Sequence, residues 1–209
     1  LRYSLNECYG LLLVISFTSY QLHVVVSDIN CKTLYELKSE IDKYDFLLVK
    51  KVIDEAKVKL ESNQFKNIPL RCVVISLPGL INTRTAELQN GPQFSDDFTS
   101  KSIFDYVTKT LNCNVLFYND TKLMMAAELS SGEFNDVTSG MLAYIDYGVG
   151  GSFEFDDKLY LGSRGYGGEI GRIKVNIDGE QLNLDDAASI RSMKEALLKE
   201  TGNKYKTNK

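Results

Sequence analysis

Strand and helix signals alternate along this chain, and their order constrains the fold more than any other feature. Residues 11–17 (LLLVISF) form an apolar run typical of a buried strand, and residues 23–27 and 72–76 read the same way. Between them, residues 46–61 place apolar side chains at steps of three and four. This spacing predicts an amphipathic helix, with Asp45 as its N-cap. Such alternation favours an α/β layered fold over an all-α or all-β one.

The rest of the chain extends this order, with a hairpin turn expected at residues 28–31. The loop over residues 81–99 is long enough to be functional or mobile, and the tail at residues 203–209 is expected to fray. The later elements are a helix over 100–111 that faces inward through Ile103, Phe104, Val107 and Leu111, a strand over 115–118, a helix over 121–131 with Asp120 as N-cap, a strand over 141–145 and a helix over 184–200.

Charge and cysteine content exclude several functional classes. The formal net charge is −4 and the pI about 5.2, so direct binding of nucleic acid by these residues is not expected. The cysteines are Cys8, Cys31, Cys72 and Cys113. Because no two form a CxxC pair, we expect four buried free thiols in a reducing cytosol. The single histidine, His23, is expected on a strand, so a catalytic triad that contains histidine is not expected.

The longest apolar run, residues 10–17, is too short to cross a bilayer and has no signal-peptide features. We therefore expect a cytoplasmic protein that does not use a membrane. The first residue, Leu1, is not a start methionine, which suggests a fragment of a longer protein.

Three polar or glycine-rich clusters could carry chemistry. Asn119 and Asp120 end a predicted strand, where α/β sheets gather ligands, although Asp120 could simply cap a helix. Residues 146–152 (DYGVGGS) follow another strand and could cradle an anion with backbone N–H groups, or form an ordinary glycine-rich hairpin. Glu169 and Arg172 flank a tight turn that suits hydroxyl recognition, or form a surface ion pair.

Together these clusters resemble the ROK family of sugar kinases and sugar-responsive repressors, over residues 11–190. No single motif is specific, but the order and spacing of five are. The similar segments are residues 73–80 (VVISLPGL, the PG loop), 118–132 (YNDTKLMMAAELSSG), 146–152 (the second phosphate loop), 165–171 (GYGGEIG, the family's G-x-A-G-E-I-G-H signature) and 184–189 (LDDAAS).

The resemblance implies an actin-like ATPase (ribonuclease H-like) fold of two lobes, incomplete at the C-terminus, with a sugar cleft between them. We place the N-terminal lobe at residues 1–118 and the start of the second lobe at 119–209. The implied ligand-binding residues are Asn119, Asp120 (the position of the kinase base), Glu169, Arg172, Asp185 and Gly79, and the phosphate-loop remnant is Gly148, Gly150 and Gly151.

Several departures from the family pattern affect the expected chemistry. The first phosphate loop, D-I-G-G-T, falls on residues 16–20 (SFTSY), which lack the acid and both glycines. Arg172 replaces the signature histidine, and residues 177–182 contain none of the family's zinc-loop cysteines. We therefore expect no metal, no cofactor and no catalytic residue.

These features lead to three competing hypotheses. The first is a sugar- or sugar-phosphate-sensing effector domain of a ROK-type transcriptional regulator, a homodimer that reaches DNA only through a DNA-binding domain absent from this chain. The second is a ligand-free pseudo-kinase that serves as a dimerisation module. The third, less favoured, is an active ROK sugar kinase.

Overall fold

The computed structural model describes residues 6–18, 20–41, 43–82, 85, 87–89, 94–95, 99–132 and 136–202. The tail predicted at residues 203–209 and part of the loop predicted at residues 81–99 lie outside these ranges. The chain forms two compact units, Leu1–Asp120 and Thr121–Lys209, where the sequence analysis placed the division after residue 118. Within the described ranges, no helix is long and apolar enough to cross a membrane.

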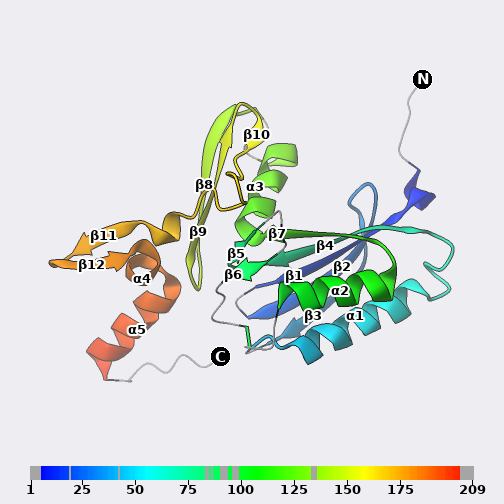
Figure 1. Ribbon diagram of the computed structural model, residues 1–209, viewed down its shortest axis with the longest axis horizontal. Helices are drawn as coiled ribbons and strands as arrows, with labels where there is room; N and C mark the ends of the chain where they lie inside the picture. The colour runs from blue at the N-terminus through cyan, green and yellow to red at the C-terminus, as the bar shows by residue number, and fades with distance from the viewer. Residues whose placement is uncertain are drawn as a thin grey trace. The chain divides into compact units, whose positions relative to one another are not determined.

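Unit 1 is built around a five-stranded sheet in the order β3-β2-β1-β4-β7 (Figure 1). The first three strands are antiparallel neighbours, and β4 and β7 join parallel to β1. The elements are η1 (Glu7–Tyr9), β1 (Leu11–Phe17), β2 (Gln21–Asp28), β3 (Thr33–Glu40), α1 (Phe46–Leu60), β4 (Leu70–Leu77), β5 (Leu80–Ile81), β6 (Leu88–Gln89), α2 (Ser100–Leu111) and β7 (Asn114–Asn119).

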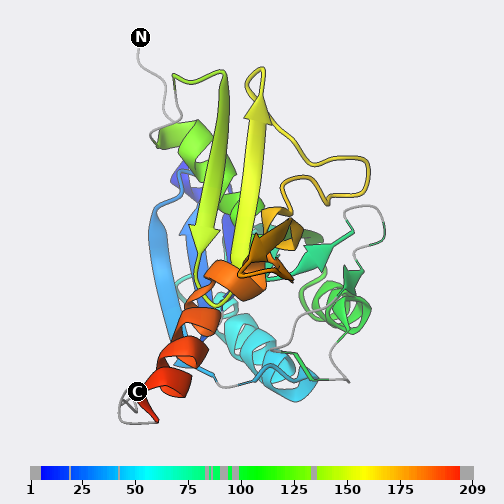
Figure 2. The ribbon, with the colours of Figure 1, turned by 90° about the vertical axis from the view of Figure 1, so that its left-hand side faces the viewer.

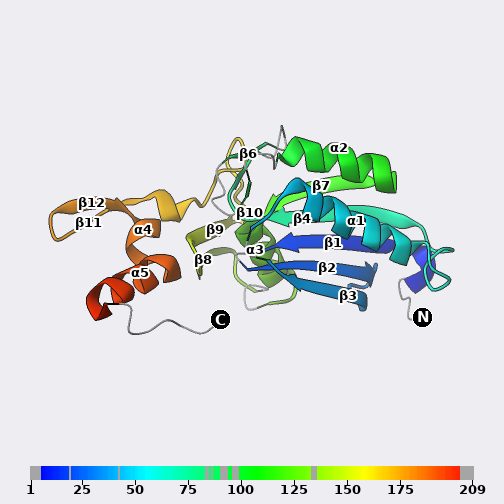
Figure 3. The ribbon, with the colours of Figure 1, turned by 90° about the horizontal axis from the view of Figure 1, so that it is seen from below.

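The core of unit 1 lies where α1 and α2, side by side in Figure 3, pack on this sheet. Every second residue of β1 is buried, and Ile53 of α1 and Ile103 of α2 are fully buried against the strands. The predicted N-cap of α1 is confirmed, because the Asp45 side chain accepts a hydrogen bond of 2.7 Å from the Leu48 N–H.

Unit 2 holds a three-stranded antiparallel sheet, β10-β9-β8, whose long β8–β9 hairpin is seen in Figure 2. Among the described residues, β8 has a strand neighbour on one side only. The elements are α3 (Asp120–Ser131, which begins at the last residue of unit 1), β8 (Ser139–Ile145), β9 (Val149–Phe155), β10 (Lys158–Leu159), η2 (Ile170–Arg172), β11 (Lys174–Ile177), β12 (Glu180–Asn183), α4 (Leu184–Ala188) and α5 (Ile190–Thr201).

The prediction of four buried thiols is wrong. Cys8 and Cys31 are exposed, and Cys72 and Cys113 are half-buried, although all four are free as predicted. Cys8 lies in η1 and Cys31 in the β2–β3 turn, which are surface segments rather than core strands. His23 is a strand residue as predicted, and its Nε2 lies 2.7 Å from an exposed carboxylate oxygen of Glu36 on β3.

Two further helix predictions need correction. Phe104 lies at the edge of the core of unit 1: it is 37% exposed, although its ring lies 6.0 Å from that of the core residue Phe117, because Ile103 and Val107 carry the buried face of α2. The helix predicted over residues 184–200 is two helices. Ser189 between them has extended backbone (ψ 158°), and its side chain caps α5 by accepting from the Ser192 N–H.

Candidate functional site

The carboxyl ends of β4 and β7 bring two predicted ligand residues together. The strands are parallel neighbours, with Leu77 opposite Asn119. The chain turns after β4 at Gly79, whose φ of 111° favours glycine. The Asn119 side-chain amide donates a hydrogen bond of 2.9 Å to the Gly79 carbonyl oxygen. This edge of the sheet is where α/β folds place ligands.

Asp120 follows Asn119 directly and is the first residue of α3, which begins one residue before the predicted helix at 121–131. The helix begins without a linker because β7 stays paired with β4 through Asn119. The Asp120 carboxylate is half-buried at the carboxyl end of β7. Its negative charge at the first turn of a helix is electrostatically favourable.

The β1–β2 turn includes the residues that correspond to the family's first phosphate loop, and its polar groups form hydrogen bonds with one another. The Thr18 N–H donates to the Gln21 carbonyl (2.9 Å), and the Gln21 N–H donates to the Thr18 hydroxyl (3.1 Å). The buried Tyr44 hydroxyl then donates to the carbonyl oxygens of Thr18 (2.8 Å) and Gln21 (2.6 Å). Burial raises the pKa of Tyr44 to about 12. The N–H groups of Thr18 and Gln21 are thus engaged inside the turn.

The glycine turn, which we define as residues 146–152, contains the hairpin connection between β8 and β9 and the first residues of β9. Its Asp146 N–H donates to the Gly148 carbonyl (2.8 Å), and its Val149 N–H donates to Asp185 Oδ1 at 2.6 Å. A Cβ on Gly148 would lie 2.7 Å from that same carboxylate oxygen. Glycine at position 148 is therefore needed for the close approach of Asp185.

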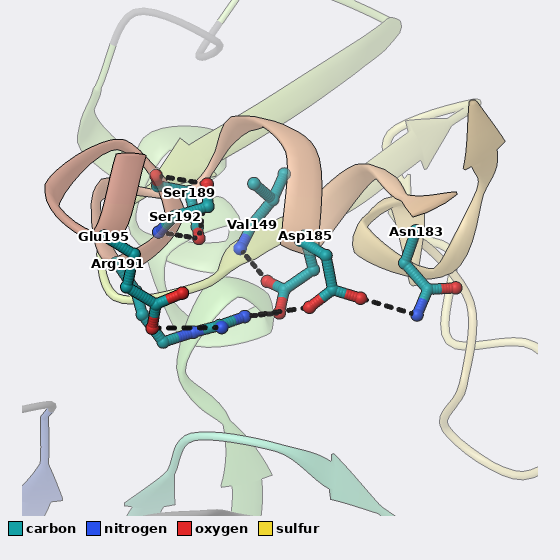
Figure 4. Close-up of polar contacts among 8 residues, drawn as sticks. Val149, Asn183, Asp185, Ser189, Arg191, Ser192 and Glu195 are labelled. Carbon is teal, nitrogen blue, oxygen red and sulfur yellow. Dashed lines mark hydrogen bonds and ion pairs between the residues drawn. The ribbon is translucent and has the colours of Figure 1, made fainter. Parts of the chain in front are cut away.

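Arg191 on α5 holds the Asp185 carboxylate from the other side (Figure 4). Its guanidinium nitrogen Nη2 lies 3.3 Å from Asp185 Oδ2 and 3.0 Å from Asp186 Oδ1. The hydrogen bonds from Arg191 and then Asn183 lower the pKa of Asp186, and the bond to Asp186 raises the pKa of Arg191. A guanidinium between two carboxylates is a charge-assisted arrangement that fixes all three side chains.

The segment around Glu169 packs directly on the glycine turn. A Cβ on Gly168, whose φ is +82°, would lie 2.6 Å from the Gly151 carbonyl oxygen, and a Cβ on Gly171 would collide with the carbonyl oxygen of Val149. The two glycine-rich segments predicted as separate clusters are therefore one packed structure. Glu169 is half-buried just before η2, and Arg172 ends η2 with an exposed side chain.

Arg172 forms no ion pair within the described part of the chain. The carboxylate of Asp185 pairs instead with Arg191. An exposed guanidinium always carries its charge and only donates hydrogen bonds. The signature position of this chain therefore presents a fixed positive charge.

The sequence analysis missed three residues that contact these turns, Tyr44, Lys122 and Arg191, and the buried Glu154. Lys122 of α3 is buried and donates to the Gly151 carbonyl at 3.0 Å. Glu154 of β9 is buried, neither carboxylate oxygen has a hydrogen-bond partner among the described residues, and burial raises its pKa. For Lys122 and Glu154 the available signal was a charged residue within an apolar helix or strand, where burial is costly unless the charge is paired.

Asn119 and Asp120 belong to unit 1, whereas Glu169, Arg172 and Asp185 belong to unit 2. Their gathering in one cleft stays a prediction. Across the residues that the structure describes, no group of three or more His, Cys, Asp or Glu side chains could hold a metal ion. The expected absence of zinc likewise stays a prediction.

The family model for the ROK family matches residues 20–208 of this chain. The chain is 22% identical, over 204 residues, to a xylose repressor of Caldicellulosiruptor bescii. This alignment covers 93% of the chain and 50% of the repressor, so the chain spans about half the length of that curated relative.

Solved structures show the same fold. A ROK family transcriptional regulator, a homologue of the E. coli MLC protein, superposes with a TM-score of 0.78 at 20% identity, over 96% of this chain and 52% of the regulator. A ROK family glucokinase from Streptomyces griseus, solved with glucose and AMPPNP, superposes with a TM-score of 0.72 at 18% identity, over 93% of this chain and 62% of the kinase. The mixed α/β fold predicted here, the actin-like ATPase fold of ROK kinases and regulators, is confirmed.

Proposed function

The chain belongs to the ROK family, which contains sugar kinases and transcriptional regulators, and from this premise we propose that it is a sugar- or sugar-phosphate-sensing effector domain without phosphotransfer activity. One observation carries the proposal: in the β1–β2 turn the N–H groups of Thr18 and Gln21 are engaged within the turn, and Tyr44 holds the turn. Phosphoryl transfer depends on positioning phosphate groups against such donors. A turn in which these two donors are engaged supports ligand sensing rather than catalysis.

The edge formed by Gly79, Asn119 and Asp120 supports binding of a polyol. The hydrogen bond from Asn119 to Gly79 orients the amide, and the half-buried Asp120 carboxylate beside it can accept from a hydroxyl group. Recognition of hydroxyl groups needs this combination of fixed donors and acceptors, and it does not need a competent phosphate loop.

The proposed regulator is a homodimer that works in the cytoplasm, and it contacts DNA only through a DNA-binding domain outside this chain. The four free thiols support a reducing compartment. The similarity to a xylose repressor and to an MLC-like regulator supports the regulatory branch. A twofold assembly is the commonest arrangement for pairing two DNA-binding units.

The test of sensing is a thermal-shift screen of the 209-residue chain with neutral sugars, sugar phosphates and ATP–Mg. We expect one sugar or sugar phosphate, but not ATP, to raise the melting temperature, because a ligand that binds only the native state stabilises it. Asp120→Asn should weaken binding about tenfold or more, as expected for a lost charge-assisted hydrogen bond. Asp105→Asn, on the exposed face of α2, is the matched control and should bind like the wild type.

Two outcomes would contradict the proposal. Sugar-dependent release of ADP by the wild type, well above that of Asp120→Asn, would identify an active kinase. No stabilisation by any sugar, together with a stable dimer in sedimentation, would identify the ligand-free dimerisation module. The exposed apolar side chains on β8, Met141 and Ile145, favour that second candidate because an uncovered apolar face suits self-association.

We further propose that the exposed Arg172 selects an anionic ligand over a neutral sugar. Arg172→His should reduce the preference for a sugar phosphate over its parent sugar by about tenfold, the size of one charge-assisted contact. Arg164→His, at an exposed position in the same loop, is the matched control and should keep the wild-type preference. Equal preferences in wild type and Arg172→His would contradict this assignment.

A further inference from the structure

We propose that the glycine turn is an anion-binding turn occupied by the chain's own Asp185 carboxylate and thereby closed to phosphate. The sensing of sugar neither requires nor explains this closure, so the inference goes beyond the proposed function. It concerns residues of unit 2 only.

The first argument is the position of the carboxylate on the turn. A backbone N–H exposed by glycines after a strand is the group that an anion such as phosphate would accept from. Here the Val149 N–H donates to Asp185 Oδ1 at 2.6 Å, across 36 residues of sequence. The absence of a side chain at Gly148 leaves the space that this oxygen enters. The carboxylate thus takes the place of an external anion.

The second argument is that the carboxylate is held from behind. Arg191 pairs with Asp185 at 3.3 Å and with Asp186 at 3.0 Å, and its guanidinium lies 5.8 Å from the centre of the Tyr147 ring within the turn. The Ile190 N–H, at the start of α5, donates to the Asp146 carbonyl at 2.8 Å. α4 and α5 are therefore attached to the turn at Asp146, Tyr147 and Val149.

The third argument is electrostatic. A phosphate approaching the turn would meet the carboxylates of Asp146, Asp185, Asp186 and Glu195, whereas Arg191 forms ion pairs with three of them and Lys174 acts on Asp186 from farther away. Like charges a few ångströms apart repel strongly at a partly buried site. The glycine turn therefore keeps a phosphate-loop sequence while excluding phosphate, because an internal anion already satisfies it.

The test removes the carboxylate and asks whether the turn gains phosphate. The probe is inorganic pyrophosphate, and the readout is the backbone amide NMR signal of Val149 in the 209-residue chain. In the wild type this signal should not move. In Asp185→Ala it should move on addition of pyrophosphate, with an affinity about tenfold or more above any wild-type binding, because one charge and one hydrogen-bond competitor are gone.

Two further variants keep the test decisive. Glu200→Ala removes one negative charge from an exposed position on α5 and should behave like the wild type, so that a general charge effect is distinguished from opening of the turn. Asp185→Asn keeps an acceptor oxygen for Val149 but loses the charge. If Asp185→Ala does not fold, Asp185→Asn tests the inference by itself. It should bind pyrophosphate at the Val149 amide, more weakly than expected for Asp185→Ala.

The inference is overturned if the Val149 signal of the wild type responds to pyrophosphate as strongly as that of the variants. It is equally overturned if neither folded Asp185 variant responds at Val149. Both results are independent of whether the chain binds a sugar, so failure of this inference and failure of the proposed function are distinguishable.

Discussion

The hairpins β1–β2 of unit 1 and β8–β9 of unit 2 follow the same plan but meet different surroundings. β1 and β8 each have seven residues and each begins an antiparallel pair. β1 is flanked by strands on both sides, and its alternate residues are fully buried, whereas β8 has one strand neighbour among the described residues and exposes Met141 and Ile145. An apolar strand therefore becomes core only where neighbouring elements cover it.

The turns of the two hairpins also differ, in the side chain that holds each of them. The β1–β2 turn has lost its glycines and is held by a neutral hydroxyl, that of Tyr44. The glycine turn keeps its glycines and is held by a carboxylate, that of Asp185. In the first turn the N–H groups of Thr18 and Gln21 are engaged after loss of the phosphate-loop sequence, and in the second the Val149 N–H is engaged although the glycines are kept.

The largest expected difference between the two hairpins is the effect of truncating an isoleucine on stability. Ile15→Ala in β1 should lower the free energy of unfolding by about 2–5 kcal/mol, because Ile15 is 1% exposed and truncation leaves a cavity. Ile145→Ala in β8, where the side chain is 52% exposed, should cost about 0.5 kcal/mol or less. Urea denaturation followed by circular dichroism measures both.

Equal costs for the two variants would break the comparison, because they would mean that the outer face of β8 is covered in solution. Repeating the Ile145→Ala measurement at several protein concentrations shows whether a second copy of the chain covers the outer face of β8. A cost that grows with concentration points to a second copy of the chain.

Hydrophobic pattern and turn chemistry predict much of unit 1 because these signals are local. The strand at residues 11–17, the Asp45 cap and the meeting of Gly79 with Asn119 all follow from residues close in sequence or from the rule that parallel strands end at one edge. The break at Ser189 was missed because the residues on both sides of it keep a helical pattern. No local signal shows that Asp185 reaches a backbone N–H 36 residues away.

The second prediction concerns the Tyr44 hydroxyl. Tyr44→Phe should lower the free energy of unfolding by about 1–2 kcal/mol, because the half-buried Thr18 carbonyl group loses the Tyr44 hydroxyl as donor, whereas the Gln21 carbonyl group keeps the Thr18 N–H. The pKa of Tyr44 is raised to about 12, so its contribution is present below the ordinary tyrosine pKa and is lost as pH rises through about 12. Denaturation midpoints measured from pH 8 to 11 should fall in the wild type and stay flatter in Tyr44→Phe. Parallel curves would contradict the assignment.

The third prediction compares a glutamate from each unit. Burial raises the pKa of Glu154, so its contribution to folding is fully present below the unfolded pKa and is lost as pH rises through the folded one. Lys38, and then His23, lower the pKa of Glu36, so its contribution is present above the unfolded pKa and is lost as pH falls. Near pH 7, Glu154→Gln should therefore raise the melting temperature, and Glu36→Gln should lower it slightly.

Melting curves between pH 4 and pH 8 check both signs, and the two variants serve as each other's controls. For Glu154→Gln the gain should shrink as the pH falls, because the wild-type carboxyl group becomes protonated and no longer opposes burial. A Glu154→Gln variant that is less stable than the wild type at pH 7 would mean that this carboxylate has an ionic partner in solution.

The last prediction compares the matched N-caps of α1 and α5. Asp45 accepts from the Leu48 N–H at 2.7 Å, and Ser189 accepts from the Ser192 N–H at 3.1 Å, so each alanine substitution should cost about 1 kcal/mol. The two substitutions should affect different measurements of stability. α1 contributes buried residues to the core of unit 1, whereas α5 has none. Asp45→Ala should therefore lower the main unfolding transition, and Ser189→Ala should speed amide hydrogen exchange in α5 while leaving that transition almost unchanged.

If Ser189→Ala instead lowers the main transition as much as Asp45→Ala, then α5 is part of the cooperative core, and the attachment of α5 to the glycine turn through Arg191 and Ile190 stabilises the whole of unit 2.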